Sequence, residues 1–137
     1  SSASISDQFA KVVDFISIGT NDLTQYIMAA DRGNSNLSKY QNPLHPAVLR
    51  AISDVINNCK KNKIEVSVCG EMASDPISAL VLYILGLRTF SMSPSAAPFV
   101  FEMLEEHYQN IPDKFEKKIL SALNAEEVKV LIKENIL

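Results

Sequence analysis

Three polar residues follow a short apolar stretch near the start of the chain. Residues 14–18 are rich in strand formers, and Thr20, Asn21 and Asp22 come directly after Gly19. An amide and a carboxylate in this place can cap the next helix, which is the commoner role. They can also hold a ligand or a hard cation, because carboxylate oxygens are the usual ligands of such ions. The stretch taken alone favours the cap.

A cysteine ends a second apolar stretch. Cys69 follows residues 64–68 and precedes Gly70, so its thiol is expected at the ligand-binding end of a strand. A thiol can donate and recover a proton, since its pKa is tunable toward neutrality. It can also be a small buried core residue, and Cys69 alone leaves both roles open. Cys59 lies on an apolar helical stripe and fits the packing role.

An arginine lies in a long polar loop, residues 31–43. The guanidinium of Arg32 is a planar fork that binds phosphate oxygens in pairs, and its charge does not titrate. A solvated loop arginine is the ordinary alternative. The loop is longer than a plain connector, and long loops at the ligand end of α/β folds are often functional.

Alternating strands and helices must position these residues. Parallel strands joined by helices form right-handed crossovers, so the pattern predicts an α/β fold. Three strands cannot close a barrel, which takes about eight. The expected strands are 14–18, 64–68 and 89–92. The first strand is expected to be buried on both faces. The expected helices are 5–13, 22–30, 46–63, 76–86, 95–107, 112–123 and one after Asn124.

Several local signals mark where these helices begin. Ser4 or Ser6 is a candidate cap for the first helix, and Pro46 suits the first position of another. Asp75 is expected to cap the helix that starts at Pro76. Asn124 is expected to cap the last helix, with Glu127 at the capping-box position.

Composition limits the class of protein. The chain has 137 residues, is 47% hydrophobic and carries a net charge of −3. It is therefore expected to fold, without the basic surface that nucleic acids or anionic membranes require. The apolar stretch 77–87 is too short to span a bilayer. Two cysteines do not make a disulfide framework, and reduced thiols in a cytoplasmic protein are the simpler interpretation.

Five blocks of sequence carry a resemblance to a known family. In order, they are GTNDLTQY, ADRGN, LHPAVLR, CGEMA followed by DP, and FSMS. Together they resemble the phosphoenolpyruvate-binding domain of Enzyme I, the phosphoenolpyruvate–protein phosphotransferase of the bacterial sugar phosphotransferase system. The resemblance covers residues 5–107. It implies the C-terminal portion of a (β/α)8 TIM barrel in residues 1–107, followed by a helical extension in residues 108–137.

The resemblance implies a role for each candidate residue. Cys69 matches the catalytic proton donor to the enolate carbon of phosphoenolpyruvate, and Arg32 matches a phosphate ligand. Asn21 matches a residue that contacts phosphoenolpyruvate. Asp22 matches a substrate-binding residue that is also one of two magnesium-binding acids. The implied cofactor is Mg²⁺, and the implied small molecules are phosphoenolpyruvate and pyruvate.

Parts of the family pattern have no counterpart in this sequence. The second metal-binding acid and two further arginines lie upstream in the family, and Ser74 replaces a common glycine. The phosphorylated histidine belongs to a separate N-terminal domain, and neither His45 nor His107 matches it. The chain begins Ser1-Ser2-Ala3-Ser4 without an initiator Met, so we expect a piece of a longer protein that is inactive alone. The implied protein partners are the histidine-containing phosphocarrier, through that missing domain, and a second copy in a homodimer.

Two alternatives stay open. Pyruvate phosphate dikinase and phosphoenolpyruvate synthase share the barrel and a block like GTNDLTQ, although GEMASDP and ADRGN favour Enzyme I. A non-catalytic dimerisation module is the other alternative, because the helices around residues 48–59 and 99–104 are apolar enough to bind a partner. The sugar and nitrogen-regulatory branches of Enzyme I are not separated by this sequence.

Overall fold

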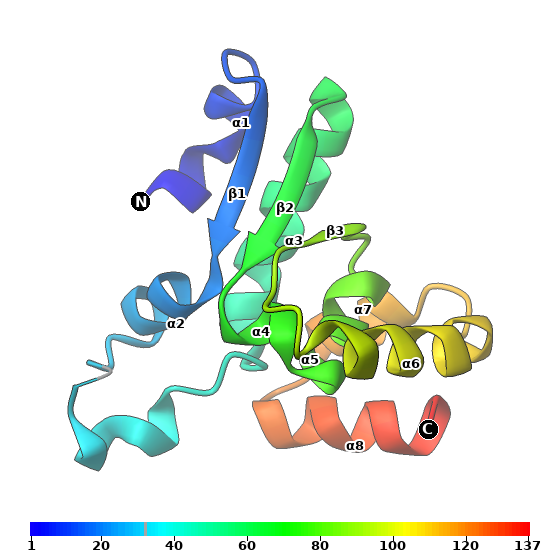
Figure 1. Cartoon of the computed structure of the whole chain (residues 1–137). Helices are drawn as coiled ribbons and strands as arrows, with labels where there is room; N and C mark the ends of the chain where they lie inside the picture. The colour runs from blue at the N-terminus through cyan, green and yellow to red at the C-terminus, as the bar shows by residue number, and fades with distance from the viewer. Residues whose placement is uncertain (32) are drawn as a thin grey trace.

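One parallel sheet organises the molecule. The structure is a computed structural model that describes residues 1–31 and 33–137, apart from the side chain of Ser38. Strands β1 (Phe15–Gly19), β2 (Glu65–Cys69) and β3 (Thr89–Phe90) form the sheet in the order β1-β2-β3, and both pairings are parallel. Figure 1 shows β1 and β2 side by side, with β3 beyond β2. The predicted α/β class with three parallel strands is confirmed, and the architecture is consistent with part of a β/α barrel.

Helices connect and cover the strands. Helix α3 runs along the sheet, and α6, α7 and α8 lie together near the C-terminus (Figure 1). The α-helices are α1 (Ser6–Phe9), α2 (Thr20–Met28), α3 (Pro46–Asn62), α4 (Glu71–Ser74), α5 (Pro76–Ile84), α6 (Ala97–His107), α7 (Phe115–Ser121) and α8 (Ala125–Asn135). The 3-10 helices are η1 (Ser2–Ile5), η2 (Ser35–Tyr40) and η3 (Tyr108–Asn110).

Helix α3 is the centre of the hydrophobic core. Pro46 takes the first helical position, as predicted, and His45 Nδ1 caps the helix by accepting from the Ala47 N–H at 3.2 Å. The helix ends at Asn62, and the next residue, Lys63, has a φ of 58°, the left-handed conformation typical of a C-terminal cap. Its apolar stripe packs against Ile18 and Val68 of the sheet and against α5, α7 and α8. The stripe consists of Val48, Leu49, Ile52, Val55, Ile56 and Cys59.

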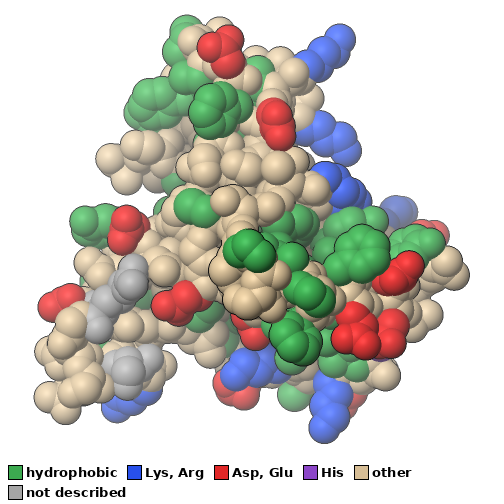
Figure 2. Space-filling view, viewed as in Figure 1, with side chains coloured by type: hydrophobic (Ala, Val, Ile, Leu, Met, Phe, Trp, Pro, Cys, Tyr) green, Lys and Arg blue, Asp and Glu red, His purple; other side chains and the backbone are tan. Residues whose placement is uncertain are grey.

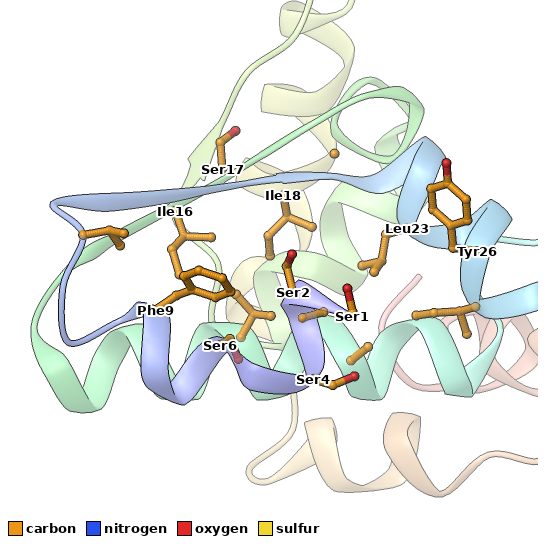
Figure 3. Close-up of a pocket in the computed structure, with 16 residues that line it drawn as sticks. Ser1, Ser2, Ser4, Ser6, Phe9, Ile16, Ser17, Ile18, Leu23 and Tyr26 are labelled. Carbon is orange, nitrogen blue, oxygen red and sulfur yellow. The ribbon is translucent and has the colours of Figure 1, made fainter.

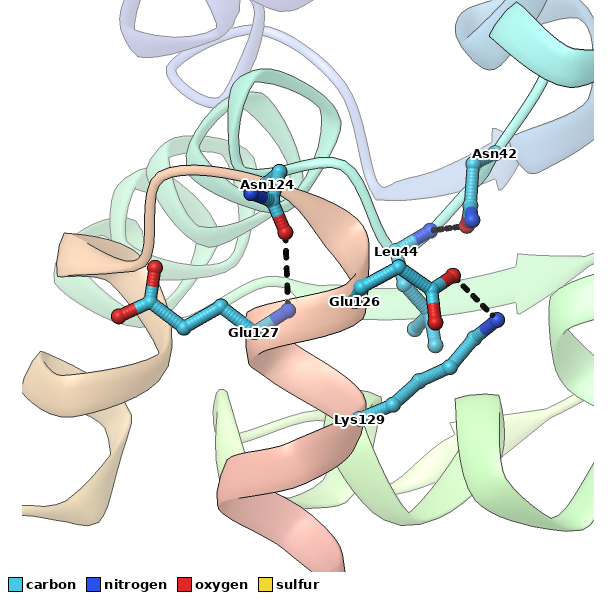
Figure 4. Close-up of polar contacts among 6 residues, drawn as sticks. All are labelled: Asn42, Leu44, Asn124, Glu126, Glu127 and Lys129. Atoms are coloured by element: carbon cyan, nitrogen blue, oxygen red, sulfur yellow. Dashed lines mark hydrogen bonds and ion pairs between the residues drawn. The ribbon is translucent and has the colours of Figure 1, made fainter.

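The last helix, α8, is held by a side-chain cap and by buried apolar residues. Asn124 Oδ1 accepts from the Glu127 N–H at 2.9 Å, as predicted (Figure 4). The Glu127 carboxylate accepts from the N–H of Leu123 at 2.8 Å, one residue before the expected donor, Asn124. Val128 and Ile132 of α8 are buried, so this helix completes the core on the α3 side of the sheet.

Strand β1 is less buried than its sequence predicts. Phe15 is 64% exposed, and Ser17 and Gly19 are exposed too. Ile16 and Ile18 point toward the helices whereas Ser17 points to the other face (Figure 3). The expectation of burial on both faces is therefore wrong for this chain, because helices cover one face of β1 and β2 is its one neighbour in the described part of the chain.

Four local predictions need correction. The helix expected over 5–13 is shorter, and neither Ser4 nor Ser6 caps it; the Ser6 hydroxyl instead accepts from Asn58 Nδ2 at 2.9 Å. Helix α2 starts before residue 22 because its first residues follow the strand without a connecting turn. Strand β3 is shorter than 89–92. The short helices η2 and α4 lie where no helix was expected.

Candidate functional site

The carboxyl ends of β1 and β2 meet at one place. Gly19 and Cys69 are the last register pair of the two strands. Helix α2 begins with Thr20 immediately after β1, while Gly70 and the short helix α4 follow β2. The polar residues after each strand are therefore neighbours, at the edge of a parallel sheet where ligands usually bind.

Two consecutive side chains of α2 bond to the backbone that follows β2. The hydroxyl of Thr20 donates to the Cys69 carbonyl at 2.9 Å. Asn21 Oδ1 accepts from the Glu71 N–H at 3.0 Å. We call this pair of bonds the tip clamp. It joins residues about 50 positions apart in sequence and holds the two strand ends together.

Gly70 lies between the two bonded peptides, and its environment excludes a side chain. Its φ is +96°, a conformation that residues with a Cβ rarely adopt. A Cβ at this position would lie 2.8 Å from Thr20 Oγ1 and 3.0 Å from Asn21 Oδ1. The close approach of the two turns therefore depends on glycine.

The tip clamp orients the Asn21 amide. A backbone N–H needs an acceptor, so the oxygen of the side chain must face Glu71. The Nδ2 group, with its two N–H donors, is left for another partner. Asn21 thus presents hydrogen-bond donors, which suit the oxygens of an anion. Its predicted role as a helix cap is wrong, since α2 has Gly19 at the cap position and no side-chain cap bond.

The two cysteines lie in different environments. Cys69 is partly exposed and Cys59 is buried, and both are free thiols. Successive side chains of a strand point to opposite faces, so Cys69 lies on the face opposite Val68, away from the α3 core. Burial raises the pKa of the Cys59 thiol above its ordinary value of 9.0. The packing role predicted for Cys59 is confirmed.

Asp22 lies in the first turn of α2 and is exposed. A carboxylate there is favoured by the partial positive charge of the helix N-terminus. Among the described residues, the structure contains no group of three or more His, Cys, Asp or Glu side chains that could hold a metal ion. Asp22 is therefore a single candidate ligand. Arg32, the predicted phosphate ligand, lies outside the described residues.

Two polar hollows flank the tip clamp, and Asn21 and Glu71 line both. One, of about 280 Å³, lies toward the loop before α3 and includes Gln25 and Gln41. The other, of about 400 Å³, is wide open and lies toward the end of β3. Cys69 and Asp22 are not among the residues that line either hollow. The structure thus brings Asn21 and the Cys69–Glu71 backbone together, with Asp22 adjacent to Asn21 in the chain.

A larger hollow lies elsewhere, beside β1. It measures about 730 Å³ and is bounded by η1, α1, β1 and α2, with Phe9, Ile16 and Leu23 on its apolar wall (Figure 3). The serines Ser1, Ser2 and Ser4 also line it. No Asp, Glu, His or Cys lines it, whereas Glu71 lines both hollows beside the tip clamp, so acid–base chemistry is better served there.

Sequence reasoning overlooked Thr20 and the backbone of Glu71. Thr20 was treated as one polar residue among three, yet its side chain is completely buried and bonded to the neighbouring strand end. A threonine directly after a glycine that ends a strand was the available signal. Glu71 takes part through its backbone N–H, which donates to Asn21 Oδ1.

Comparison with known proteins connects this geometry to a family. Residues 1–108 match the family model described as "PEP-utilising enzyme, PEP-binding domain". The phosphoenolpyruvate-protein phosphotransferase of Bacillus subtilis is 46% identical over 134 residues, 98% of this chain and 24% of the relative. That of Geobacillus stearothermophilus is 44% identical over 131 residues, 96% of this chain and 23% of the relative.

A relative of another type aligns over less of the chain. The probable phosphoenolpyruvate synthase of Pyrococcus horikoshii is 42% identical over 102 residues, 74% of this chain and 12% of the relative. The chain spans about a quarter of the length of the phosphotransferases that it matches. In the described part of the chain, no helix is long and apolar enough to cross a membrane. The extent of the family match, with the identity to these relatives, shows that the chain belongs to the family of PEP-utilising enzymes, as a PEP-binding domain.

Proposed function

We propose that the chain binds phosphoenolpyruvate at the carboxyl ends of β1 and β2 and contributes to phosphoryl transfer onto a protein histidine. The names of the relatives support phosphoenolpyruvate as the substrate and a protein as the acceptor. The tip clamp supports the proposed location of the site. Because Asn21 Oδ1 accepts from the Glu71 N–H, the Asn21 Nδ2 donors point away from Glu71. This orientation is the single observation on which the proposal depends most.

The residues have separate roles in this proposal. Asn21 Nδ2 donates to the carboxylate or the phosphate of the substrate, and Arg32 neutralises phosphate oxygens. Transfer of a phosphoryl group depends mainly on such neutralisation and on positioning. Any other basic side chain that binds the same phosphate would likewise neutralise its oxygens.

Cys69 protonates the product enolate. The P–O bond to the enol oxygen breaks, and the phosphoryl group forms a new bond to a histidine nitrogen. The electron pair left on the enolate takes a proton from the Cys69 thiol at carbon, which gives pyruvate and a thiolate. The thiolate recovers its proton from solvent, to which the partly exposed side chain has access.

Asp22 is the residue of this chain that fits Mg²⁺. Mg²⁺ is usually held by one or two carboxylates together with substrate phosphates, and the exposed Asp22 carboxylate supplies one of them. When bound, the ion would neutralise charge on the phosphate oxygens. The described residues hold no group of three or more candidate ligands, so Asp22 is the one carboxylate of this chain that we assign to the ion.

Titration with phosphoenolpyruvate tests the proposed site. We expect millimolar phosphoenolpyruvate with Mg²⁺ to shift the amide NMR signals of Asn21, Gly70 and Glu71. Asn21→Ala should weaken binding at least tenfold. Asn135→Ala is the matched control, since it removes an amide that bonds within α8, to the Leu131 carbonyl, and should leave binding unchanged. The absence of any shift at the strand ends would contradict the proposal.

The wider assembly is also part of the proposal. Residues 1–107 form the barrel portion and residues 108–137 a helical extension; the family match that ends at 108 supports this division. The acceptor histidine belongs to another domain, which serves a histidine-containing phosphocarrier in the cytoplasm. The isolated chain is therefore expected to show no phosphoenolpyruvate-dependent phosphorylation, and radiolabel on the purified chain would contradict this.

Two observations favour secondary candidates. The identity to a phosphoenolpyruvate synthase favours an enzyme of that type, although its alignment is shorter than those of the phosphotransferases. Phe99 and Phe101 of α6 are 64% and 66% exposed. Figure 2 shows hydrophobic side chains together in the region of α6, and such a patch favours a homodimer. Light scattering during the phosphoenolpyruvate titration tests the dimerisation module, because self-association without ligand shifts would favour it.

A further inference from the structure

The hydroxyl of Thr20 continues the connection between β1 and β2 beyond their last register pair. Gly19 and Cys69 end the ladder, and the next bond between the two segments is the one from Thr20 Oγ1 to the Cys69 carbonyl, at 2.9 Å. Thr20 is 0% exposed. A buried hydroxyl is costly without a partner, so this bond offsets the cost of burying the Thr20 hydroxyl.

Thr20 does not act as the cap of its own helix. The cap position of α2 is Gly19, and no side chain makes a cap bond there. Instead, the Thr20 bond reaches a carbonyl 49 residues away in the sequence. Its β-branched side chain has few rotamers, which favours one direction for the hydroxyl. The bond therefore holds the backbone of Cys69 in place from the neighbouring strand end.

Holding this carbonyl affects the thiol on the same residue. The carbonyl direction sets the backbone ψ angle of Cys69, and the allowed side-chain rotamers depend on the backbone angles. The backbone after Cys69 is also restrained. Asn21 Oδ1 binds the Glu71 N–H, and Gly70 is closely packed between the two bonds. The two bonds of the tip clamp thus limit the orientations that the Cys69 sulfur can take.

We propose that Thr20 is the positioning residue for the Cys69 thiol. It acts through the Cys69 carbonyl and has no contact with substrate in this role. The catalytic meaning of the inference rests on the proposed function, in which Cys69 delivers a proton to one carbon atom. The positioning itself is a property of this chain and can be measured without any substrate.

The test measures the alkylation rate of Cys69 by iodoacetamide between pH 6 and pH 10. Trypsin cleaves between the two cysteines at Lys60, Lys61 and Lys63, so mass spectrometry reads Cys69 separately from Cys59. Thr20→Val keeps the shape but removes the hydroxyl, and should raise the rate at least threefold because the released turn exposes the sulfur more often. Thr20→Ser keeps the hydroxyl and should restore the rate to within twofold of wild type.

Thr24→Val is the matched control. Thr24 lies one turn later in α2 and is also buried, and its hydroxyl has no partner among the described residues. Removing this hydroxyl should leave Cys69 alkylation unchanged, so a general loosening of α2 is distinguished from loss of the Thr20 bond. A wild-type rate and pH profile in a folded Thr20→Val protein would overturn the inference, and equal acceleration in Thr24→Val would do the same.

A second measurement covers the case in which Thr20→Val does not fold. In the wild-type protein, the Thr20 hydroxyl proton should exchange slowly enough to be seen by NMR, because it is buried and hydrogen-bonded. Its absence in a folded sample would overturn the inference. Neither measurement contains phosphoenolpyruvate, so the positioning role and the proposed function can fail separately.

Discussion

Strands β1 and β2 have nearly the same pattern of residues but differ in burial. Their sequences are FISIG and EVSVC, and each places two aliphatic residues around a central serine. Val68 of β2 is 0% exposed, and Ser67 and Cys69 are partly buried. In β1, Phe15, Ser17 and Gly19 are all exposed. Figure 2 shows hydrophobic side chains at the surface of the α1 and β1 region, where Phe9, Val12 and Phe15 lie.

The difference shows that position in the sheet decides burial when the local pattern does not. β2 has a strand on each side, whereas β1 has one neighbour among the described strands and an apolar hollow of about 730 Å³ beside it. An edge strand with exposed apolar residues is a surface prone to association. The tip clamp lies where the well-packed strand meets the open one.

The largest expected effect contrasts the core with the open side. Ile52→Ala removes a completely buried side chain from α3, and should lower the free energy of unfolding by about 2–5 kcal/mol. Val12→Ala, at a residue that is 81% exposed on the open side, should change it by less than about 0.5 kcal/mol. Urea unfolding of both variants measures the contrast. Equal losses would show that the open side is as well packed as the core.

The next contrast is between Gly19, which ends β1, and Gly70, which follows β2. Gly70→Ala should lower stability by about 1–3 kcal/mol, because a side chain there is strained at φ +96° and meets Thr20. Gly19 has a φ of −80°, and a Cβ there would meet nothing within 4 Å. Gly19→Ala should therefore change stability by less than about 1 kcal/mol. Thermal unfolding by circular dichroism compares them; a larger loss for Gly19→Ala would contradict the geometry of the tip clamp.

A smaller expected effect comes from α8, where the cap at the helix start is compared with an exposed ion pair. Asn124→Ala removes the cap of α8 and should lower stability by about 1 kcal/mol. Lys129→Ala removes the exposed ion pair with Glu126, 2.9 Å long and also drawn in Figure 4, and should cost less than about 0.5 kcal/mol. Chemical denaturation of the two variants decides the order, and a greater loss from Lys129→Ala would reverse it.

The smallest effect is a pH dependence carried by the core cysteine. Because burial raises the pKa of Cys59 in the folded protein, its contribution to stability is complete below pH 9.0, the ordinary value. The contribution decreases as pH rises from 9.0 through the higher pKa of the folded state, since the unfolded chain releases this proton first. Unfolding measured from pH 8 to pH 11 should show this decrease, and Cys59→Ala should remove that component. An unchanged slope in the variant would assign the dependence to other groups.

Much of the fold follows from short-range patterns. The locations of the three strands, the Pro46 and Pro76 helix starts and the Asn124 cap were predictable, because each depends on residues within a few positions of one another. The parallel direction of the strands followed from their alternation with helices. The Asp75 cap was predictable for the same reason, and its carboxylate accepts from the Ser78 N–H at 2.9 Å. The region of the candidate site was also predictable, since polar residues after parallel strands gather at one edge.

The partners of those residues were decided by the tertiary structure. Asn21 has the local pattern of a helix cap, but its oxygen binds Glu71, 50 residues later. Ser6 was another expected cap and instead bonds to Asn58 of α3. A polar side chain close to a helix start can bond to a local group or to a distant one. Only the packing of the sheet decides which of these groups lies within reach.

The sequence by itself determined where strands and helices alternate and which residues follow each strand. The tertiary structure decided that β1 is half-open, that Gly70 must have no side chain and that Thr20 reaches Cys69. The physical reason is range: helix caps and strand patterns act over a few residues. The tip clamp instead requires two turns, far apart in the chain, to meet within 3.0 Å.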